Sequence, residues 1–129
     1  MENKALVTDD NNIVRDYLHA EDLFAMIGKC VDADRINDVF DVCSLQPVSK
    51  QEILEYFVSA YALRYETRPR TTNASATGAK SNYFSTYGQA VGIGFSPGYS
   101  SMDTIKLVTE HILPRHKYAM NGNRNHYER

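Results

Sequence analysis

Apolar residues recur at helical spacing in three separate stretches of this chain. Glu21 and Asp22 precede the first stretch, and their carboxylates suit the positive N-terminal end of a helix. The apolar positions of the three stretches are, in order, Leu23, Phe24, Ile27 and Val31; Ile53, Leu54, Phe57, Val58 and Tyr61; and Ile105, Val108 and Ile112. This periodicity predicts three main helices.

Two capping-box sequences indicate where the second and third helices begin. The Ser49 hydroxyl and the Glu52 carboxylate can satisfy backbone amides that have no partner in the first helical turn. Ser100 and Asp103 offer the same arrangement before the third helix, and Pro114 is expected to end that helix.

Short β-prone runs separate the predicted helices. Residues 4–8 precede a turn-forming cluster, a second strand starts at Ile13, and residues 39–43 have the composition of a buried strand. Residues 64–78 are interrupted by arginine, proline and glycine, so we expect a loop there. Residues 82–85 form a short run rich in tyrosine and phenylalanine, and residues 87–95 indicate a short helix broken by glycine.

The elements together predict one small α/β domain, with short strands and three main helices, over residues 1–114. A polar tail follows at residues 115–129. The chain has 129 residues and 43% apolar content, which suffices for one hydrophobic core but not for two. Its formal charge of −2 supplies no basic field that would attract nucleic acid or an anionic membrane.

The two cysteines and the N-terminus indicate the compartment. Cys30 and Cys43 lie thirteen positions apart without the spacing of a metal site, so we expect small core side chains in a reducing cytosol. The first residues lack the features of a signal peptide, and no apolar run is long enough to span a bilayer. We therefore expect a cytoplasmic protein with no membrane partner.

Three segments of the chain resemble a known family. Residues 14–23, VRDYLHAEDL, resemble the VRDYIHVxDL segment of the extended short-chain dehydrogenase/reductases, the NAD-dependent nucleotide-sugar epimerases and dehydratases. Residues 39–49 and 53–56 are similar to the strand, turn and helix of the family's YNxGSGxxxSxxExxxxI segment, and residues 95–105 to its LGYxPxYSSLxxGI segment. The resemblance implies the C-terminal, substrate-binding part of such an enzyme.

The family's catalytic and cofactor-binding elements do not occur in this sequence. The resemblance places a glycine-rich dinucleotide loop, a catalytic Ser or Thr and a Tyr-x-x-x-Lys pair in an N-terminal half, and none of the nine tyrosines here has lysine four residues on. Hydride transfer requires a held nicotinamide and a tyrosine acid/base. We therefore expect no cofactor and no catalysis in this chain alone, whereas NAD or NADP is implied for the complete family enzyme. The chain would be a truncated or split product that works with a separate cofactor-binding chain, or else a relic of such an enzyme.

The resemblance also implies substrate-binding residues. Arg15 matches the motif arginine that contacts the nucleotide diphosphate, and a guanidinium suits that anion, although pairing with a carboxylate is an alternative. Tyr83 occupies a position near the sugar, where an aromatic ring can pack on a pyranose face, although core packing is equally compatible. Arg70, or else Arg68, is the candidate for a second diphosphate contact.

The first motif contains a histidine between two carboxylates. Asp16, His19 and Asp22 invite a catalytic or metal-binding interpretation, but residues 16 and 22 do not converge by local geometry in an extended strand. The resemblance implies structural work at a strand-to-helix corner instead. At residues 43–46 the chain lacks the glycines that usually bound this turn in the family, so its conformation is open.

Two functions follow as expectations. The first is binding of a nucleotide-diphosphate sugar, as part of surface-polysaccharide sugar synthesis. The alternative is a non-enzymatic interaction protein derived from the same fold, whose apolar surfaces mediate self-association or binding to another subunit. Nucleic-acid binding by the arginine-rich segment is disfavoured by the net negative charge.

Overall fold

The structure is a computed structural model, and it describes residues 4–69, 82–86 and 88–113 of the chain. Within these ranges it forms a small mixed α/β domain, with three α-helices, one 3-10 helix and five short strands in two sheets. The fold class expected from the sequence is confirmed at this level. The proposed tail, residues 115–129, lies outside the described residues.

The three predicted helices are confirmed as α1 (Ala20–Asp32), α2 (Lys50–Tyr61) and α3 (Ser101–Ile112). Both capping boxes form, because the Ser49 and Ser100 hydroxyls accept from backbone amides while Glu52 and Asp103 accept from the cap residues. Helix α1 begins differently: Nδ1 of His19 accepts the backbone N–H of Glu21 at 3.2 Å.

The strands form two small sheets. In the first, β1 (Leu6–Asp9) pairs in parallel with β4 (Tyr65–Arg68). In the second, β2 (Val14–Arg15) lies between β3 (Val48–Ser49), which is antiparallel to it, and β5 (Asn82–Tyr83), which is parallel. The expected strands near residues 4–8 and at Ile13 are therefore present, with boundaries shifted by one or two residues.

Two predictions about the strands are wrong. Residues 39–43 are not a strand: Phe40 and Val42 pack against the core, but among the described residues no strand pairs with this segment. Residues 64–78 are not wholly a loop either, since β4 occupies the start of that range and pairs with β1 over four residues. Strand formation depends on a partner as much as on composition. Residues 70–78 lie outside the described part of the chain.

The short helix expected in residues 87–95 is confirmed as the 3-10 helix η1 (Gln89–Ile93). Gly94 ends it with φ of +78°, and its N–H donates to the carbonyls of Ala90 and Val91. A left-handed residue at this position favours glycine, because a Cβ would be strained there.

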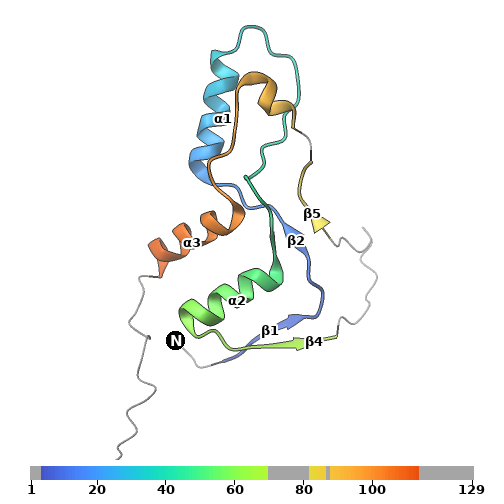
Figure 1. Cartoon of the computed structure of the whole chain (residues 1–129), viewed down its shortest axis with the longest axis vertical. Coiled ribbons are helices and arrows are strands. Elements are labelled where there is room, and N and C mark those ends of the chain that lie inside the picture. The colour runs from blue at the N-terminus through green and yellow to red at the C-terminus, as the bar shows by residue number, and fades with distance from the viewer. Residues whose placement is uncertain (1–3, 70–81, 87, 114–129) are drawn as a thin grey trace, which may run out of the picture.

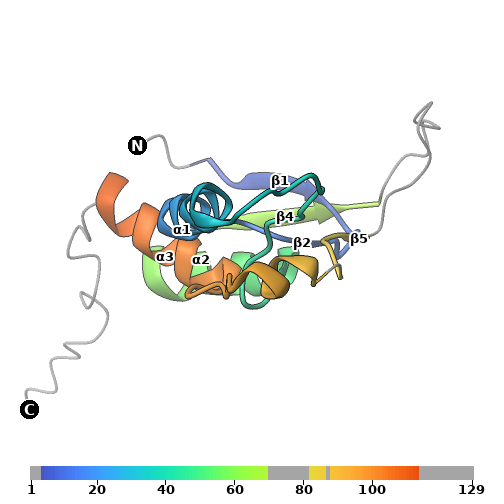
Figure 2. The same cartoon turned by 90° about the horizontal axis from the view of Figure 1, so that it is seen from above.

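The elements are arranged in two parts. In Figure 1, α1 and η1 lie at the top, α2, β1 and β4 lie at the bottom, and β2 and α3 lie between them. In Figure 1 and Figure 2 alike, the α-helices are on the left and the strands on the right. Between α1 and η1 lies a small core of Met26, Ala90 and Phe95, against which Phe40, Val42 and Ile93 pack.

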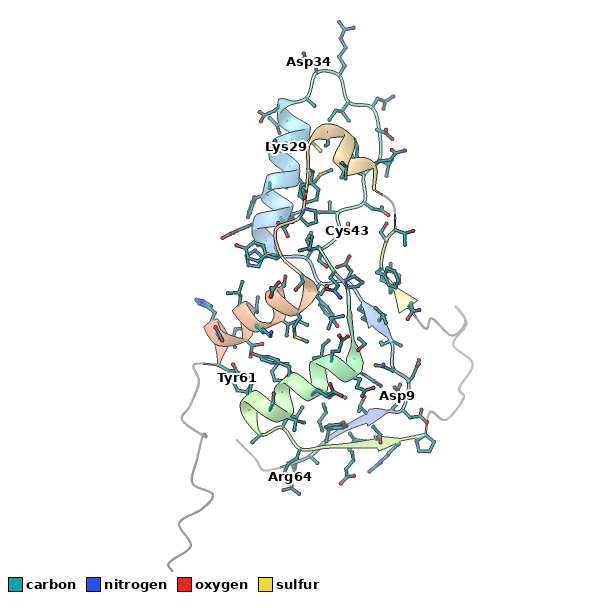
Figure 3. The ribbon with its side chains drawn as sticks, viewed as in Figure 1. Asp9, Lys29, Asp34, Cys43, Tyr61 and Arg64 are labelled. Atoms are coloured by element: carbon teal, nitrogen blue, oxygen red, sulfur yellow. The ribbon has the colours of Figure 1, made fainter. Side chains whose placement is uncertain are left out.

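Both cysteines are free thiols and half-buried. Cys30 packs against the core cluster, as the sequence predicts. Cys43 lies near the middle of the molecule (Figure 3), and burial raises the pKa of its thiol, with the nearby carboxylates of Asp16 and Asp41 adding to the shift. A raised pKa keeps this thiol protonated and unreactive.

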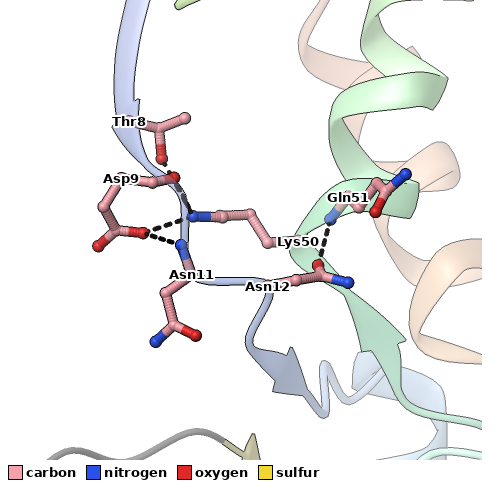
Figure 4. Close-up of polar contacts among 6 residues, drawn as sticks. All are labelled: Thr8, Asp9, Asn11, Asn12, Lys50 and Gln51. Atoms are coloured by element: carbon pink, nitrogen blue, oxygen red, sulfur yellow. Dashed lines mark hydrogen bonds and ion pairs between the residues drawn. The ribbon is translucent and has the colours of Figure 1, made fainter. Parts of the chain in front are cut away.

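A cluster of polar contacts links the two-stranded sheet of β1 and β4 to α2. The Lys50 ammonium donates to both the backbone carbonyl and the carboxylate of Asp9, and Asn12 accepts the backbone N–H of Gln51 at 2.9 Å (Figure 4). The same Asp9 carboxylate accepts the N–H of Asn11, which fixes the turn after β1. The turn-forming cluster expected after residues 4–8 is residues 9–12, and its Asn12 thus also caps the start of α2.

Searching the described residues for a helix that could cross a membrane, by length and apolar character, yields none.

The capping boxes predict how stability depends on pH. Hydrogen bonds from Ser49 and Ser100 lower the pKa values of Glu52 and Asp103. Their stabilisation is present above the unfolded pKa values of about 4 and is lost as the pH falls through the lower folded values. A variant carrying Glu52→Gln and Asp103→Asn should therefore lose less thermal stability on acidification than the wild type, measured by circular dichroism melting.

Glu66→Gln combined with Asp34→Asn serves as the matched control, because it also removes two carboxylates but touches no helix cap. The melting temperatures of the wild type and of the Glu52→Gln, Asp103→Asn variant could instead fall in parallel from neutral to acid pH. That result would contradict a role of the capping boxes in the pH dependence of stability.

Candidate functional site

Arg15 and Tyr83, two residues implied to bind substrate, lie side by side on neighbouring strands. Arg15 of β2 is the register partner of Tyr83 of β5 in the parallel pair, and the backbone N–H of Asp16 donates to the Tyr83 carbonyl at 3.2 Å. Paired residues on adjacent strands project from the same face of a sheet. Both residues are exposed, Tyr83 to 64%, so the cation and the aromatic ring can be reached from solvent together.

An open hollow of about 490 Å³ lies beside this pair. One wall is formed by residues 40–42, and the other by residues 82–85, which begin with β5. The described residues that line it are Asp16, Phe40, Asp41, Val42, Asn82, Tyr83, Phe84 and Ser85. The Ser85 hydroxyl donates to the Asp41 carboxylate and joins the two walls. We call this space the aromatic hollow. Arg15 lies next to it on β2 but is not among its described lining residues.

The two candidates for a second diphosphate contact have different outcomes. Arg68 ends β4 and pairs in register with Asp9 of β1, in the two-stranded sheet rather than in the sheet that holds Arg15. The structure therefore does not bring Arg68 and Arg15 together on one sheet. Arg70 lies outside the described residues, so its implied role stays a prediction.

Asp16 holds three distant segments together. Its carboxylate accepts the backbone N–H of Ser44 at 3.1 Å and the hydroxyl of Ser101 at 3.0 Å. The Ser44 and Ser101 hydroxyls are 2.9 Å apart, and Ser101 also accepts the backbone N–H of Tyr17 at 2.8 Å. Ser101 is fully buried and Ser44 is 6% exposed. The turn at residues 43–46 is thus held by hydroxyl contacts and uses no positive φ angle.

Asp22 performs a similar role six residues further on, in the first turn of α1. It is 4% exposed, and its two carboxylate oxygens accept the backbone N–H groups of Gly98 and Tyr99 at 2.8 and 3.2 Å. His19 stacks on the Tyr99 ring with centroids 3.9 Å apart, and the Tyr99 hydroxyl donates to Glu21. That bond to a carboxylate raises the pKa of Tyr99.

These contacts give Asp16, His19 and Asp22 the structural work at the strand-to-helix corner that the resemblance implies. Each carboxylate is bound to backbone amides of a different segment. A search of the described ranges for three or more His, Cys, Asp or Glu side chains placed to hold a metal ion finds none.

Sequence reasoning missed several residues of these sites. Ser44 and Ser101 are small polar residues whose buried roles depend on contacts 57 and 85 positions away. Phe40 and Asp41 were assigned to a buried strand, yet they line the aromatic hollow. Asp41 lies in the middle of residues 39–43, and a charged side chain is rarely buried. Its presence could have indicated that this segment is exposed.

A second feature is an exposed apolar surface on α1. Leu23, Ile27 and Val31 are 41%, 48% and 77% exposed, although they follow one another at helical spacing. Together with residues 40–42 they border a shallow groove of about 360 Å³, whose described lining is Leu23, Met26, Ile27, Cys30, Val31, Phe40 and Val42. We call this the α1 groove. It lies on α1 rather than on β5, and it shares Phe40 and Val42 with the aromatic hollow.

The buried carboxylate contacts predict a large loss of stability on truncation. Asp22→Ala leaves the N–H groups of Gly98 and Tyr99 without their acceptor, so the free energy of unfolding should fall by about 2–3 kcal/mol. Urea denaturation measures the change. Asp34→Ala removes the same charge from an exposed loop and should cost far less. Equal unfolding midpoints for these two variants would show that the Asp22 contacts contribute nothing.

Comparison of the chain with protein-family models, with curated proteins and with solved structures finds no significant match in any of the three. The likeness to extended short-chain dehydrogenase/reductases therefore rests on the three sequence segments themselves.

Proposed function

We propose that this chain binds a nucleotide-diphosphate sugar, with the diphosphate at Arg15 and the sugar in the aromatic hollow beside Tyr83. The observation that carries the proposal is the register of β2 and β5, which pairs Arg15 with Tyr83. Two residues 68 positions apart in the sequence, both implied by the family resemblance, are thereby immediate neighbours.

Arg15 has the chemistry that a diphosphate requires. A guanidinium donates two parallel hydrogen bonds to neighbouring phosphate oxygens, and charge-assisted bonds of this kind are about twice as strong as neutral ones. Among the described residues the Arg15 side chain forms no ion pair, which supports a contact with a ligand over pairing with a carboxylate of that part of the chain. Its charge is therefore available to a ligand without breaking an internal contact.

The aromatic hollow suits a sugar. The rings of Phe40, Tyr83 and Phe84 offer apolar faces of the kind that pack on the C–H groups of a pyranose. The side-chain oxygen of Asn82 accepts the backbone N–H of Val14, so its amide nitrogen is the atom left to donate to a ligand hydroxyl. Pockets with apolar walls and a few oriented polar groups are typical of small-molecule sites.

The proposed role is binding rather than catalysis by this chain alone. In the family the resemblance indicates, hydride transfer uses NAD or NADP held by a glycine-rich loop, together with a Tyr-x-x-x-Lys pair. This sequence contains neither motif. A separate cofactor-binding chain would complete the enzyme of polysaccharide sugar synthesis.

The binding proposal is tested by thermal shift and calorimetry against UDP-, dTDP-, GDP-, CDP- and ADP-sugars. At least one should raise the melting temperature, and Arg15→Ala should weaken its binding tenfold or more, since a lost charge-assisted contact is worth at least about 1.4 kcal/mol. Tyr83→Ala should weaken binding of the sugar nucleotide more than binding of the free nucleoside diphosphate.

Arg64→Ala is the matched control, because Arg64 lies next to the β1–β4 sheet, away from β2 and β5 (Figure 3). It removes the same charge and should leave the affinity unchanged. A chain that gains no stability from any of these ligands, or that loses equal affinity in the Arg15 and Arg64 variants, would refute the proposal.

The α1 groove favours a second candidate function, binding to another subunit. Apolar side chains at helical spacing normally face a packed neighbour, and here Leu23, Ile27 and Val31 face solvent. The adjacent segment, residues 39–43, has the composition of a buried strand but no strand partner among the described residues. A polypeptide laid along this segment would cover both.

Charge favours a different protein over a second copy as that subunit. Around the α1 groove, residues 20–42 carry five exposed carboxylates, at positions 21, 32, 34, 38 and 41, against Lys29 and Arg35. Two copies that met through this face would bring carboxylate against carboxylate, which opposes association. A cofactor-binding chain with a basic rim would be complementary.

Size-exclusion chromatography with light scattering tests this second function. The chain should be monomeric at low ionic strength and should self-associate at high salt, where screening weakens the repulsion between carboxylates. Ile27→Gln with Val31→Gln should abolish the association, whereas Val58→Gln on α2 should not. A chain that binds no hydrophobic dye at any salt concentration would contradict an apolar interaction surface on α1, whereas a monomer that binds the dye is compatible with a different protein as the partner.

A further inference from the structure

We infer that the aromatic hollow selects an uncharged pyranose and discriminates against a hexuronic acid; this rests on the proposed nucleotide-sugar binding. The hollow has two carboxylates, Asp16 and Asp41, and no cation among its described lining residues. The charged side chains of its described lining are therefore all negative, while Asn82, Tyr83 and Ser85 supply neutral polar groups.

Neither carboxylate has a cation as its internal partner in the described contacts. Asp16 accepts only from the neutral donors of Ser44 and Ser101, and Asp41 accepts the Ser85 hydroxyl. Hydrogen bonds from neutral groups orient a carboxylate but leave its net charge in place. The field of both charges therefore acts on any group that enters the hollow.

Asp41 is the residue best placed to discriminate. It is exposed, whereas Asp16 is half-buried and bound on both oxygens by the backbone of Ser44. One oxygen of Asp41 accepts from Ser85, so its carboxylate stands between the two walls of the hollow. A neutral sugar can donate a hydroxyl to it, while the carboxylate of a uronic acid would be repelled.

The diphosphate does not meet this repulsion, because Arg15 lies beside the hollow and not within its described lining. The arrangement separates a cationic contact for the anionic part of the ligand from an anionic pocket for its neutral part. Specificity of this kind arises from a repulsive element against the wrong ligand as well as from attraction to the right one.

The test compares ligands that differ only at the sugar C6, namely UDP-glucose with UDP-glucuronate and GDP-mannose with GDP-mannuronate. Within a pair that binds, the neutral member should bind at least tenfold more tightly by calorimetry. The ratio should shrink as salt is raised, since screening weakens repulsion at an open site. Asp41→Asn, which keeps an acceptor for Ser85, should bring the two affinities within about threefold.

Asp38→Asn is the matched control. Asp38 is an exposed carboxylate three residues away that does not line the hollow, and its contact with the backbone N–H of Val39 can be kept by asparagine. It should leave the ratio unchanged. Equal binding of both members by the wild type, or discrimination that survives Asp41→Asn, would overturn the inference and leave the proposed function standing. Absence of binding by both pairs and by every dTDP-, CDP- and ADP-sugar of the earlier screen would overturn both.

Discussion

Two carboxylates within seven residues hold this small fold in one arrangement. Asp16 binds the turn at Ser44 and the start of α3, and Asp22 binds the backbone before α3 at Gly98 and Tyr99. The described hydrophobic core is small, with five buried apolar residues, and cannot position these segments alone. Buried polar groups tolerate only geometries in which they are bonded, so they specify where α3 and the turn must lie.

The same contacts orient the proposed ligand site. Asp16 directly follows β2, so the contacts of its carboxylate with Ser44 and Ser101 fix the end of the strand that carries Arg15. The Asp16 backbone also donates to the Tyr83 carbonyl, which fixes β5 against β2 and sets the Arg15 and Tyr83 pair. The hydrogen-bond network of Asp16 thus determines the geometry of the exposed Arg15 and Tyr83 pair, and Asp16 itself lines the adjoining hollow.

Local sequence patterns predicted the helices, whereas the strand pairing and the lining of the site depend on contacts between residues far apart in the sequence. The capping boxes at Ser49 and Ser100 and the helical spacing of apolar residues are short-range properties, which explains why α2 and α3 are readable from the sequence. The pairing of β4 with β1 spans nearly sixty residues, and composition alone does not reveal such a partner. For the same reason Arg15 could be named from a motif, whereas Asp41 lines the hollow opposite Ser85, a residue 44 positions away that no local pattern connects with it.

The two proposed functions meet in one segment of the chain. Phe40 and Val42 border both the aromatic hollow and the α1 groove, with Asp41 between them. A subunit packed into the groove would fix these side chains and thereby the wall of the hollow. If a ligand at one site changes the arrangement of these shared residues, the two sites are coupled, and the coupling acts equally in both directions. A sugar nucleotide that orders residues 40–42 would therefore also strengthen binding of the partner chain, so the two roles support one another.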